Sequence, residues 1–93
     1  MRIVFLPPAR FDLRWMRNYY TTIFPDGKER AERQFDALLT ALRAHPYLGR
    51  ESDTVPTARQ LAIPRTPFVL IYRVREDRIE ILRVADSRSR WSM

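Results

Sequence analysis

The sequence contains no cysteine, and His45 is its only histidine among 93 residues. The lack of cysteine excludes disulfides, thiolate metal sites and a thiol nucleophile, and one histidine cannot build a histidine-based metal cage. We therefore expect neither a metal nor a cofactor. A chain without cysteine also fits the reducing environment of the cytoplasm.

Long hydrophobic runs are missing as well. The apolar stretch near the N-terminus, Ile3 to Leu6, is interrupted by Pro7 and Pro8. It is far shorter than the roughly 7 to 15 apolar residues of a signal peptide or the ~20 residues of a membrane span. We expect a soluble chain without a membrane partner, and a length of 93 residues predicts one domain, residues 1–93, around a single core.

Lysine is nearly absent, because 16 of the 17 basic residues are arginine and only Lys28 is lysine. Against 11 acidic residues they leave a net charge of +6, which favours an acidic partner such as nucleic acid, an acidic protein or a ribosome. The planar arginine side chain suits phosphate and carboxylate, although a compositional bias of the source genome explains the preference equally well. The arginines are spread along the chain, so charge alone does not indicate nucleic-acid recognition.

Apolar spacing predicts a first helix from about Pro8 to Tyr20. Phe11, Trp15 and Tyr19 recur at i, i+4 and i+8, and a second apolar stripe lies beside them. The apolar arc is wide, so we expect these aromatic side chains to belong mainly to the core.

A second helix is predicted between Asp26 and His45. Asp26 and Glu29 have the spacing of a capping box, and Pro46 prevents the helix from continuing. His45 is therefore expected to be a helix-end residue rather than a catalytic base. The stripe that this helix buries is predicted to consist of Ala31, Phe35, Leu38, Leu39 and Leu42.

Four strands complete the pattern, and residues 47 to 56 are expected to form a loop. The strands are Arg2 to Leu6, Arg59 to Ile63 near a sheet edge, Phe68 to Val74 at the centre, and Ile79 to Ala85. In the last strand, Ile79 and Ile81 are placed on one face and Leu82 and Val84 on the other. The order strand, helix, helix, strand, strand, strand predicts an α+β fold in which a helical hairpin packs on one face of a mostly antiparallel sheet.

This element order, the chain length and the C-terminal segment FVLIYRVREDRIEILRVADSRSRW, Phe68 to Trp91, resemble the RelE/ParE superfamily of type II toxin-antitoxin toxins. The resemblance covers Met1 to Trp91. It implies a toxin, and it leaves two activities open. One is ribosome-dependent mRNA cleavage, and the other is inhibition of DNA gyrase.

The nuclease branch of that superfamily carries an arginine before a Leu-Val/Ile-Tyr triplet, a basic residue past the last strand and a terminal Tyr or His. Here Val69 precedes the triplet, and the terminal aromatic residue is Trp91, whose indole cannot exchange a proton near neutral pH. Attack by a ribose hydroxyl requires groups of all three kinds. This chain lacks the expected residue type at two of the three positions. If the chain were a nuclease, its catalytic residues would be Arg65, Tyr72, Arg88 and Arg90.

The resemblance therefore favours the ParE-like branch, an inhibitor of DNA gyrase associated with plasmid stabilization rather than an enzyme. Interface hot spots are rich in Trp, Tyr and Arg, so the predicted target-binding residues are Arg73, Arg83, Arg88, Arg90 and Trp91. Asp86 can pair with Arg73, Arg83 or Arg88, and its role would then be structural.

The resemblance also implies a cognate acidic antitoxin that binds the toxin in a hetero-oligomer. Trp15, Tyr19 and Tyr20 are the predicted antitoxin contacts, since partner helices and added strands require exposed apolar surface or an open sheet edge. A ribosome partner, as in the nuclease branch, and a small basic nucleic-acid-binding module remain the alternatives.

Overall fold

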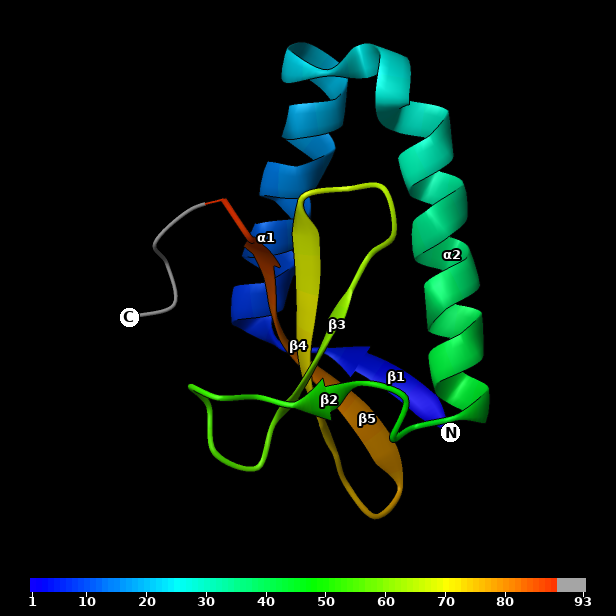
Figure 1. The fold of residues 1–93 in the computed structure, drawn as a ribbon, viewed down its shortest axis with the longest axis vertical. Helices are drawn as coiled ribbons and strands as arrows, with labels where there is room; N and C mark the ends of the chain where they lie inside the picture. The colour runs from blue at the N-terminus through cyan, green and yellow to red at the C-terminus, as the bar shows by residue number, and fades with distance from the viewer. Residues whose placement is uncertain (89–93) are drawn as a thin grey trace.

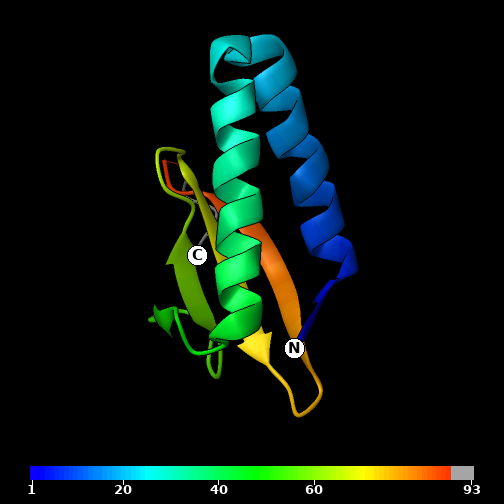
Figure 2. The same cartoon turned by 90° about the vertical axis from the view of Figure 1, so that its right-hand side faces the viewer.

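The helices and strands follow the predicted order, with one additional strand. The computed structural model describes residues 1–88. Its helical segments are α1 (Pro7–Asn18), the π-helical turn η1 (Tyr19–Ile23), the 3-10 turn η2 (Pro25–Gly27) and α2 (Lys28–Ala44). Its strands are β1 (Arg2–Phe5), β2 (Arg50–Glu51), β3 (Arg59–Ala62), β4 (Phe68–Val74) and β5 (Arg78–Asp86). Figures 1 and 2 show α1 and α2 together over one face of the sheet, which confirms the predicted α+β architecture.

The sheet has the strand order β1-β5-β4-β3-β2, so β4 lies at its centre as predicted. β1 runs parallel to β5, whereas the other neighbouring pairs are antiparallel. The additional strand, β2, lies in the stretch that was expected to be a loop. It has only two residues, Arg50 and Glu51, and both are exposed, so neither length nor apolar alternation could indicate it.

The core forms between β4, β5 and the two helices. Leu70 and Tyr72 of β4 and Ile79 and Ile81 of β5 are completely buried. The predicted stripe of α2 covers them, because its apolar positions recur on one side of the helix. Of that stripe, the residues that are buried or packed against the core are Ala31, Phe35, Leu38, Leu39 and Leu42. The buried leucines Leu38, Leu39 and Leu42 each contribute roughly 1.5–3 kcal/mol through removal of apolar surface from water.

A β-bulge changes which residues of β5 face the core. The pairing of β4 with β5 shifts between Ile71 and Tyr72, which leaves Leu82 as an extra residue in β5. The alternation of faces therefore restarts after Leu82, and Val84 joins Ile81 in the core under the helices. The prediction that Val84 faces away from Ile81 is wrong for this reason.

The turn between the helices also differs from the prediction. α1 continues into a π-helical turn, in which the Thr21 and Thr22 hydroxyls donate hydrogen bonds of 2.8 Å to the carbonyls four residues earlier. Pro25 has no N-H and opens the 3-10 turn that follows. The first helical segment thus ends at Ile23 rather than at Tyr20.

The predicted capping box at Asp26 and Glu29 is wrong. α2 begins at Lys28 with Gly27 as its N-cap residue, and no side chain caps it. A Cβ atom on Gly27 would lie 2.4 Å from the ring of Phe24, which would have to shift if another residue stood here. At the other end, the His45 N-H donates to the Ala41 carbonyl, which confirms His45 as a helix-end residue.

Candidate functional site

The aromatic residues of the first helical segment divide into buried and exposed ones. Tyr19 and Tyr20 lie in the core, whereas 67% of Phe11 and 49% of Trp15 are exposed. The expectation that all of them belong to the core is therefore correct only for the tyrosines. Of the three predicted antitoxin contacts, Trp15 alone presents a large apolar surface to a partner.

Trp15 belongs to an aromatic cluster at the end of the sheet. Its ring stacks on that of Tyr19 at 5.7 Å, with an interplanar angle of 28°. Phe68, the first residue of β4, contacts both rings edge-on, at 6.0 Å from Trp15 and 5.6 Å from Tyr19. The exposed indole is thus supported from below by two buried rings.

Arg88 completes this cluster from the end of β5. Asp86 accepts three hydrogen bonds from Arg88: from the backbone N-H at 2.9 Å, from Nε at 3.0 Å and from Nη2 at 2.8 Å. The Nη1 atom of Arg88 donates to the Tyr19 hydroxyl at 3.2 Å, and the guanidinium lies 5.0 Å from the centre of the Tyr19 ring. Asp86 therefore has the structural role considered for it, with Arg88 as its partner.

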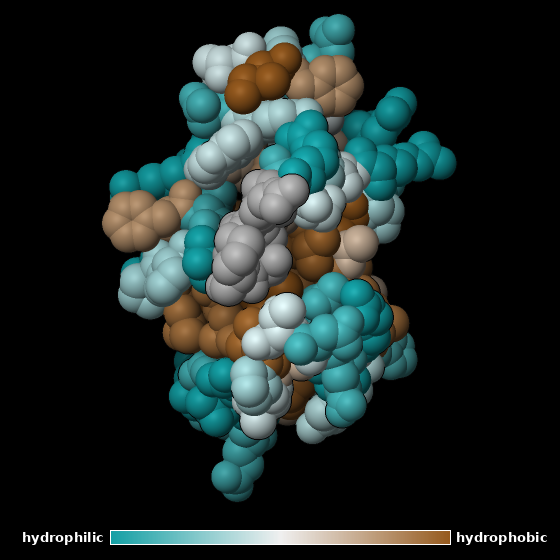
Figure 3. Space-filling model, turned by 60° about the vertical axis from the view of Figure 1, so that its left-hand side comes forward, coloured by the Kyte–Doolittle hydropathy of each residue, from teal (hydrophilic) through white to brown (hydrophobic). Residues whose placement is uncertain are grey.

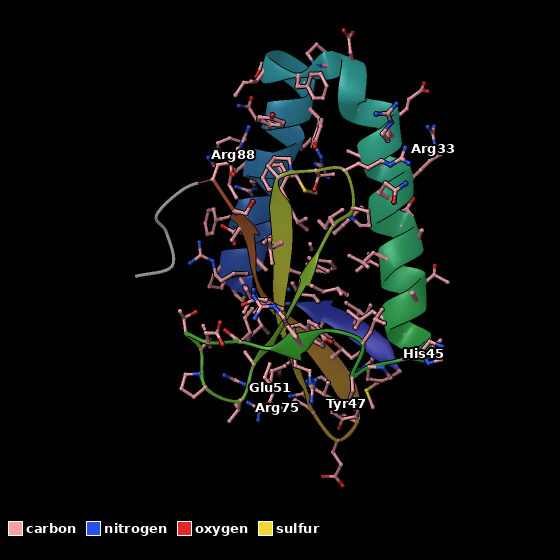
Figure 4. The ribbon with its side chains drawn as sticks, in the orientation of Figure 1. Arg33, His45, Tyr47, Glu51, Arg75 and Arg88 are labelled. Carbon is pink, nitrogen blue, oxygen red and sulfur yellow. The ribbon has the colours of Figure 1, made fainter. Side chains whose placement is uncertain are left out.

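The electrostatics of the cluster follow from these contacts. The hydrogen bonds from Arg88 hold the pKa of the Asp86 carboxyl below its ordinary value, despite an opposing effect of burial. Asp86, and then Tyr19, raise the pKa of Arg88 further above its ordinary value. Both groups are therefore charged throughout the physiological range. Figure 4 shows Arg88 beside α1, at the opposite end of the sheet from Arg75.

Arg83 lies on the same strand and is held by α1. Its Nε donates to Asp12 at 2.7 Å and its Nη2 at 3.0 Å, and Asp12 also accepts the Val84 N-H at 2.8 Å. Asp12 thus covers backbone at the part of β5 that extends past β1, where the strand edge is otherwise open. The sequence analysis missed Asp12, although it is the only acidic residue of α1.

Arg73 does not lie directly opposite Arg83. The residue opposite Arg73 is Glu80, and the residue opposite Arg83 is Ile71. The Nε atom of Arg73 is buried and has no hydrogen-bond partner within residues 1–88. Its neighbourhood is occupied by ion pairs, because Arg75 and Arg78 both bind the Glu80 carboxylate. The cross-strand register therefore does not pair Arg73 with Arg83, although both were predicted to bind the target.

Within residues 1–88, Tyr72 lies apart from Arg65, another residue that a nuclease would use. Tyr72 is completely buried, and its hydroxyl accepts the Gly49 N-H at 2.7 Å. Burial raises the pKa of this phenol above its ordinary value. Arg65 lies in the turn before β4, with a positive φ of 62°, at the end of the sheet where the Ser87 N-H binds the Pro67 carbonyl. Tyr72 lies farther along β4, so its hydroxyl cannot act together with Arg65.

Two predicted site residues, Arg90 and Trp91, lie outside the described residues. Of the predicted target-binding set, the structure therefore places Arg73, Arg83 and Arg88. Arg88 is the one that contacts the aromatic cluster, through the buried ring of Tyr19.

A groove between the helices offers a second surface, which the sequence analysis did not identify. It has a volume of about 340 Å³. Apolar side chains of both helices line its floor, and charged ones line its rim. The residues concerned are Leu13, Met16, Tyr20, Ala31 and Phe35 on the floor, and Arg17, Lys28, Glu32 and Asp36 on the rim. The signal was present as the second stripe of the first helix, but only the spacing of the two helices turns it into a groove.

One face of the molecule has a hydrophobic surface. Figure 3 shows hydrophobic side chains gathered over the middle of one face, with hydrophilic side chains above and below them.

Within residues 1–88, neither helix is long and apolar enough to cross a membrane. The same part of the chain contains no group of three or more His, Asp or Glu side chains placed to hold a metal ion.

Comparison with known proteins finds a matching family model and matching solved structures. The family model described as "ParE toxin of type II toxin-antitoxin system, parDE" matches residues 3–91. A solved structure described as "Chromosomal ParDE TA system from P. aeruginosa" contains a chain that is 29% identical. The alignment covers 92% of this chain and 95% of that one, with a TM-score of 0.73. A search of curated protein sequences found no match.

Proposed function

The chain belongs to the ParE toxin family of type II toxin-antitoxin systems, and we propose that it arrests growth in the cytoplasm by inhibiting DNA gyrase until a cognate antitoxin neutralises it. The observation that carries this proposal is the Trp15, Tyr19 and Arg88 cluster at the end of the sheet. It combines an exposed indole with an immobilised guanidinium, the side chains that dominate protein interfaces.

The arrangement of the nuclease candidates supports an inhibitor over an RNA-cleaving enzyme. Cleavage through a ribose hydroxyl needs a proton acceptor, a proton donor and cations that converge on one phosphate. Tyr72 cannot serve as either, because its phenol is enclosed and occupied by the Gly49 amide. Inhibition of gyrase requires no catalytic residues, because it needs only a surface that another protein can bind.

We infer that the antitoxin binds the groove between α1 and α2. A helical segment of a partner can place apolar side chains on the floor formed by Leu13, Met16 and Phe35. The net charge of +6 favours an acidic segment through long-range attraction. The antitoxin contact would then include Tyr20, which lines the groove, as well as the exposed ring of Trp15.

A supercoiling assay tests the function. Purified gyrase, relaxed plasmid and ATP are incubated with increasing amounts of the chain. We expect supercoiling to fall and cleaved plasmid to appear, and we expect addition of the antitoxin to restore activity. Undiminished supercoiling at a large molar excess of the chain, together with mRNA cut at codon boundaries in a translation reaction, would instead assign the chain to the ribosome-dependent nucleases.

A further inference from the structure

At the end of β5, three nitrogen atoms of one arginine side chain are held by hydrogen bonds. Asp86 binds the Nε and Nη2 atoms of Arg88, and Tyr19 accepts from Nη1. The backbone is held as well, because the Ser87 N-H donates to the Pro67 carbonyl at 2.7 Å. An arginine on a surface normally samples many rotamers, so these contacts remove freedom that a binding partner would otherwise have to restrict.

The guanidinium of Arg88 keeps donors available despite these contacts. An arginine has five N-H donors, and the side-chain hydrogen bonds that Arg88 makes within residues 1–88 use three of them. One N-H remains on each terminal nitrogen. These two nitrogens form the end of the planar fork, which matches the two oxygens of a carboxylate. Because 54% of the side chain is exposed, a partner can reach this edge.

We propose that Arg88 is a pre-oriented carboxylate-binding residue for the protein target, and that Asp86 and Tyr19 act as its positioning residues. The inference rests on the proposed function, because the carboxylate belongs to the protein that the toxin inhibits. It assigns a role to Tyr19 that differs from the predicted antitoxin contact.

A protein carboxylate is favoured over a nucleic-acid phosphate by the surroundings of Arg88. Asp86 offsets its positive charge, so the site attracts a polyanion only weakly over long distances. Trp15 contacts the same Tyr19 ring and is 49% exposed, which offers apolar contact to a neighbouring side chain of a protein. Trp and Arg are enriched in protein hot spots, and here Trp15 and Arg88 both contact the ring of Tyr19.

Three substitutions test this site in the gyrase assay. Tyr19→Phe removes only the hydroxyl, and we expect the concentration for half-inhibition to rise about threefold, the effect of losing one hydrogen bond at the low end of the usual range. Asp86→Asn leaves one oxygen acceptor and no charge, and we expect a rise of about tenfold. Arg88→Lys keeps the charge but not the fork, and it should weaken inhibition at least as much as Asp86→Asn does.

A double variant separates positioning from a general structural effect. If Tyr19 acts through Arg88, then Tyr19→Phe has no further effect in the Arg88→Lys background. Tyr47→Phe is the matched control, because Arg59 lies 5.0 Å from the Tyr47 ring as Arg88 does from Tyr19. We expect Tyr47→Phe to inhibit like the unaltered chain. Thermal unfolding of every variant shows whether it is folded at the assay temperature.

The other possible results of these experiments each contradict a different part of the proposal. An undiminished effect of Tyr19→Phe in the Arg88→Lys background, or normal inhibition by Arg88→Lys, overturns the positioning role. Binding to duplex DNA alone that Arg88→Lys abolishes would assign the site to phosphate instead. If the unaltered chain does not inhibit gyrase, the proposed function fails, and the same variants are compared by growth arrest in cells. A chain that arrests no growth overturns both proposals.

Discussion

At the scale of single residues, the same side-chain type serves different purposes depending on what surrounds it. Tyr72 and Tyr19 were both candidates for contact with a substrate or partner. Tyr72 is a core residue whose hydroxyl accepts the buried Gly49 amide. Tyr19 is also buried, but its hydroxyl reaches the exposed guanidinium of Arg88. Burial alone would give both the same role, whereas the hydrogen-bond partner distinguishes them.

Substitution of Tyr72 by Phe tests this distinction. The Gly49 amide then loses its acceptor, so the free energy of unfolding should fall by about 1–3 kcal/mol in urea denaturation. Growth arrest should persist at a temperature where the variant is folded, because Tyr72 has no role in target binding. Loss of growth arrest in a folded Tyr72→Phe variant would restore the nuclease hypothesis.

Sequence patterns named Trp15, Tyr19 and Arg88 as candidate site residues but did not predict that they lie together. The position of Arg88 after the last strand was predicted, and its contact with Tyr19, 69 residues away in the chain, was not. Asp12 was overlooked because a single acidic residue on a helix forms no recognisable sequence pattern. It acquires a structural role only because β5 lies beside α1 and donates a backbone hydrogen bond to it. Long-range contacts of this kind depend on strand register, which the bulge at Leu82 alters.

At the scale of elements, apolar periodicity was a reliable guide, and local turn chemistry was not. α2 and β4 lie where their apolar residues predicted them, because each buries a long and regular stripe. The start of α2 was misplaced because the predicted capping residue, Asp26, lies in the 3-10 turn before the helix, and no side chain caps α2. β2 is too short to have a pattern at all. The packing of neighbouring segments therefore determines the features that sequence reasoning missed.

The β4-β5 hairpin carries a pH-sensitive group. Arg75, through a hydrogen bond of 3.1 Å, and then Arg78 hold the pKa of the Glu80 carboxyl below its ordinary value of 4.5. A depressed pKa in the folded state means that the unfolded state binds the proton first as the pH falls. The stabilisation by Glu80 is thus fully present above about pH 4.5 and is lost at lower pH.

Substitution of Glu80 by Gln should therefore flatten the acid side of the stability curve. We expect the melting temperature of the unaltered chain to fall between pH 6 and pH 3 more steeply than that of Glu80→Gln. Asp86 contributes to the same decline, because its pKa is also lowered. Asp77→Asn serves as the control, since Asp77 is exposed and binds the neighbouring Arg78. Parallel curves for the unaltered chain and Glu80→Gln would contradict this account of the hairpin.

At the scale of the whole molecule, the fold presents two surfaces that are built differently. The groove between the helices has an apolar floor and a charged rim, whereas at the end of the sheet Trp15 and Arg88 both contact the ring of Tyr19. Tyr19 and Tyr20 are consecutive residues, and their side chains contribute to different surfaces. An antitoxin in the groove would therefore lie next to the proposed target site, which suggests that neutralisation is steric.

A charge placed in the groove should selectively weaken binding of the antitoxin. Met16 lines the groove, and Phe11 lies on the exposed side of the same helix. We expect Met16→Glu to weaken binding of an acidic antitoxin at least tenfold, about 1.4 kcal/mol, as measured by calorimetry. Phe11→Glu introduces the same charge on the same helix and should have a much smaller effect. Equal losses would show that net charge, rather than the groove, determines affinity.

The central claim, that this fold poisons DNA gyrase and does not cut RNA, is tested most directly by the topology of plasmid DNA in cells that express the chain. A reporter plasmid extracted shortly after induction is separated by its linking number on a chloroquine gel. The account predicts relaxed and linear plasmid as growth stops, and normal supercoiling when the antitoxin is expressed as well. Growth arrest with a normally supercoiled, intact plasmid would contradict it.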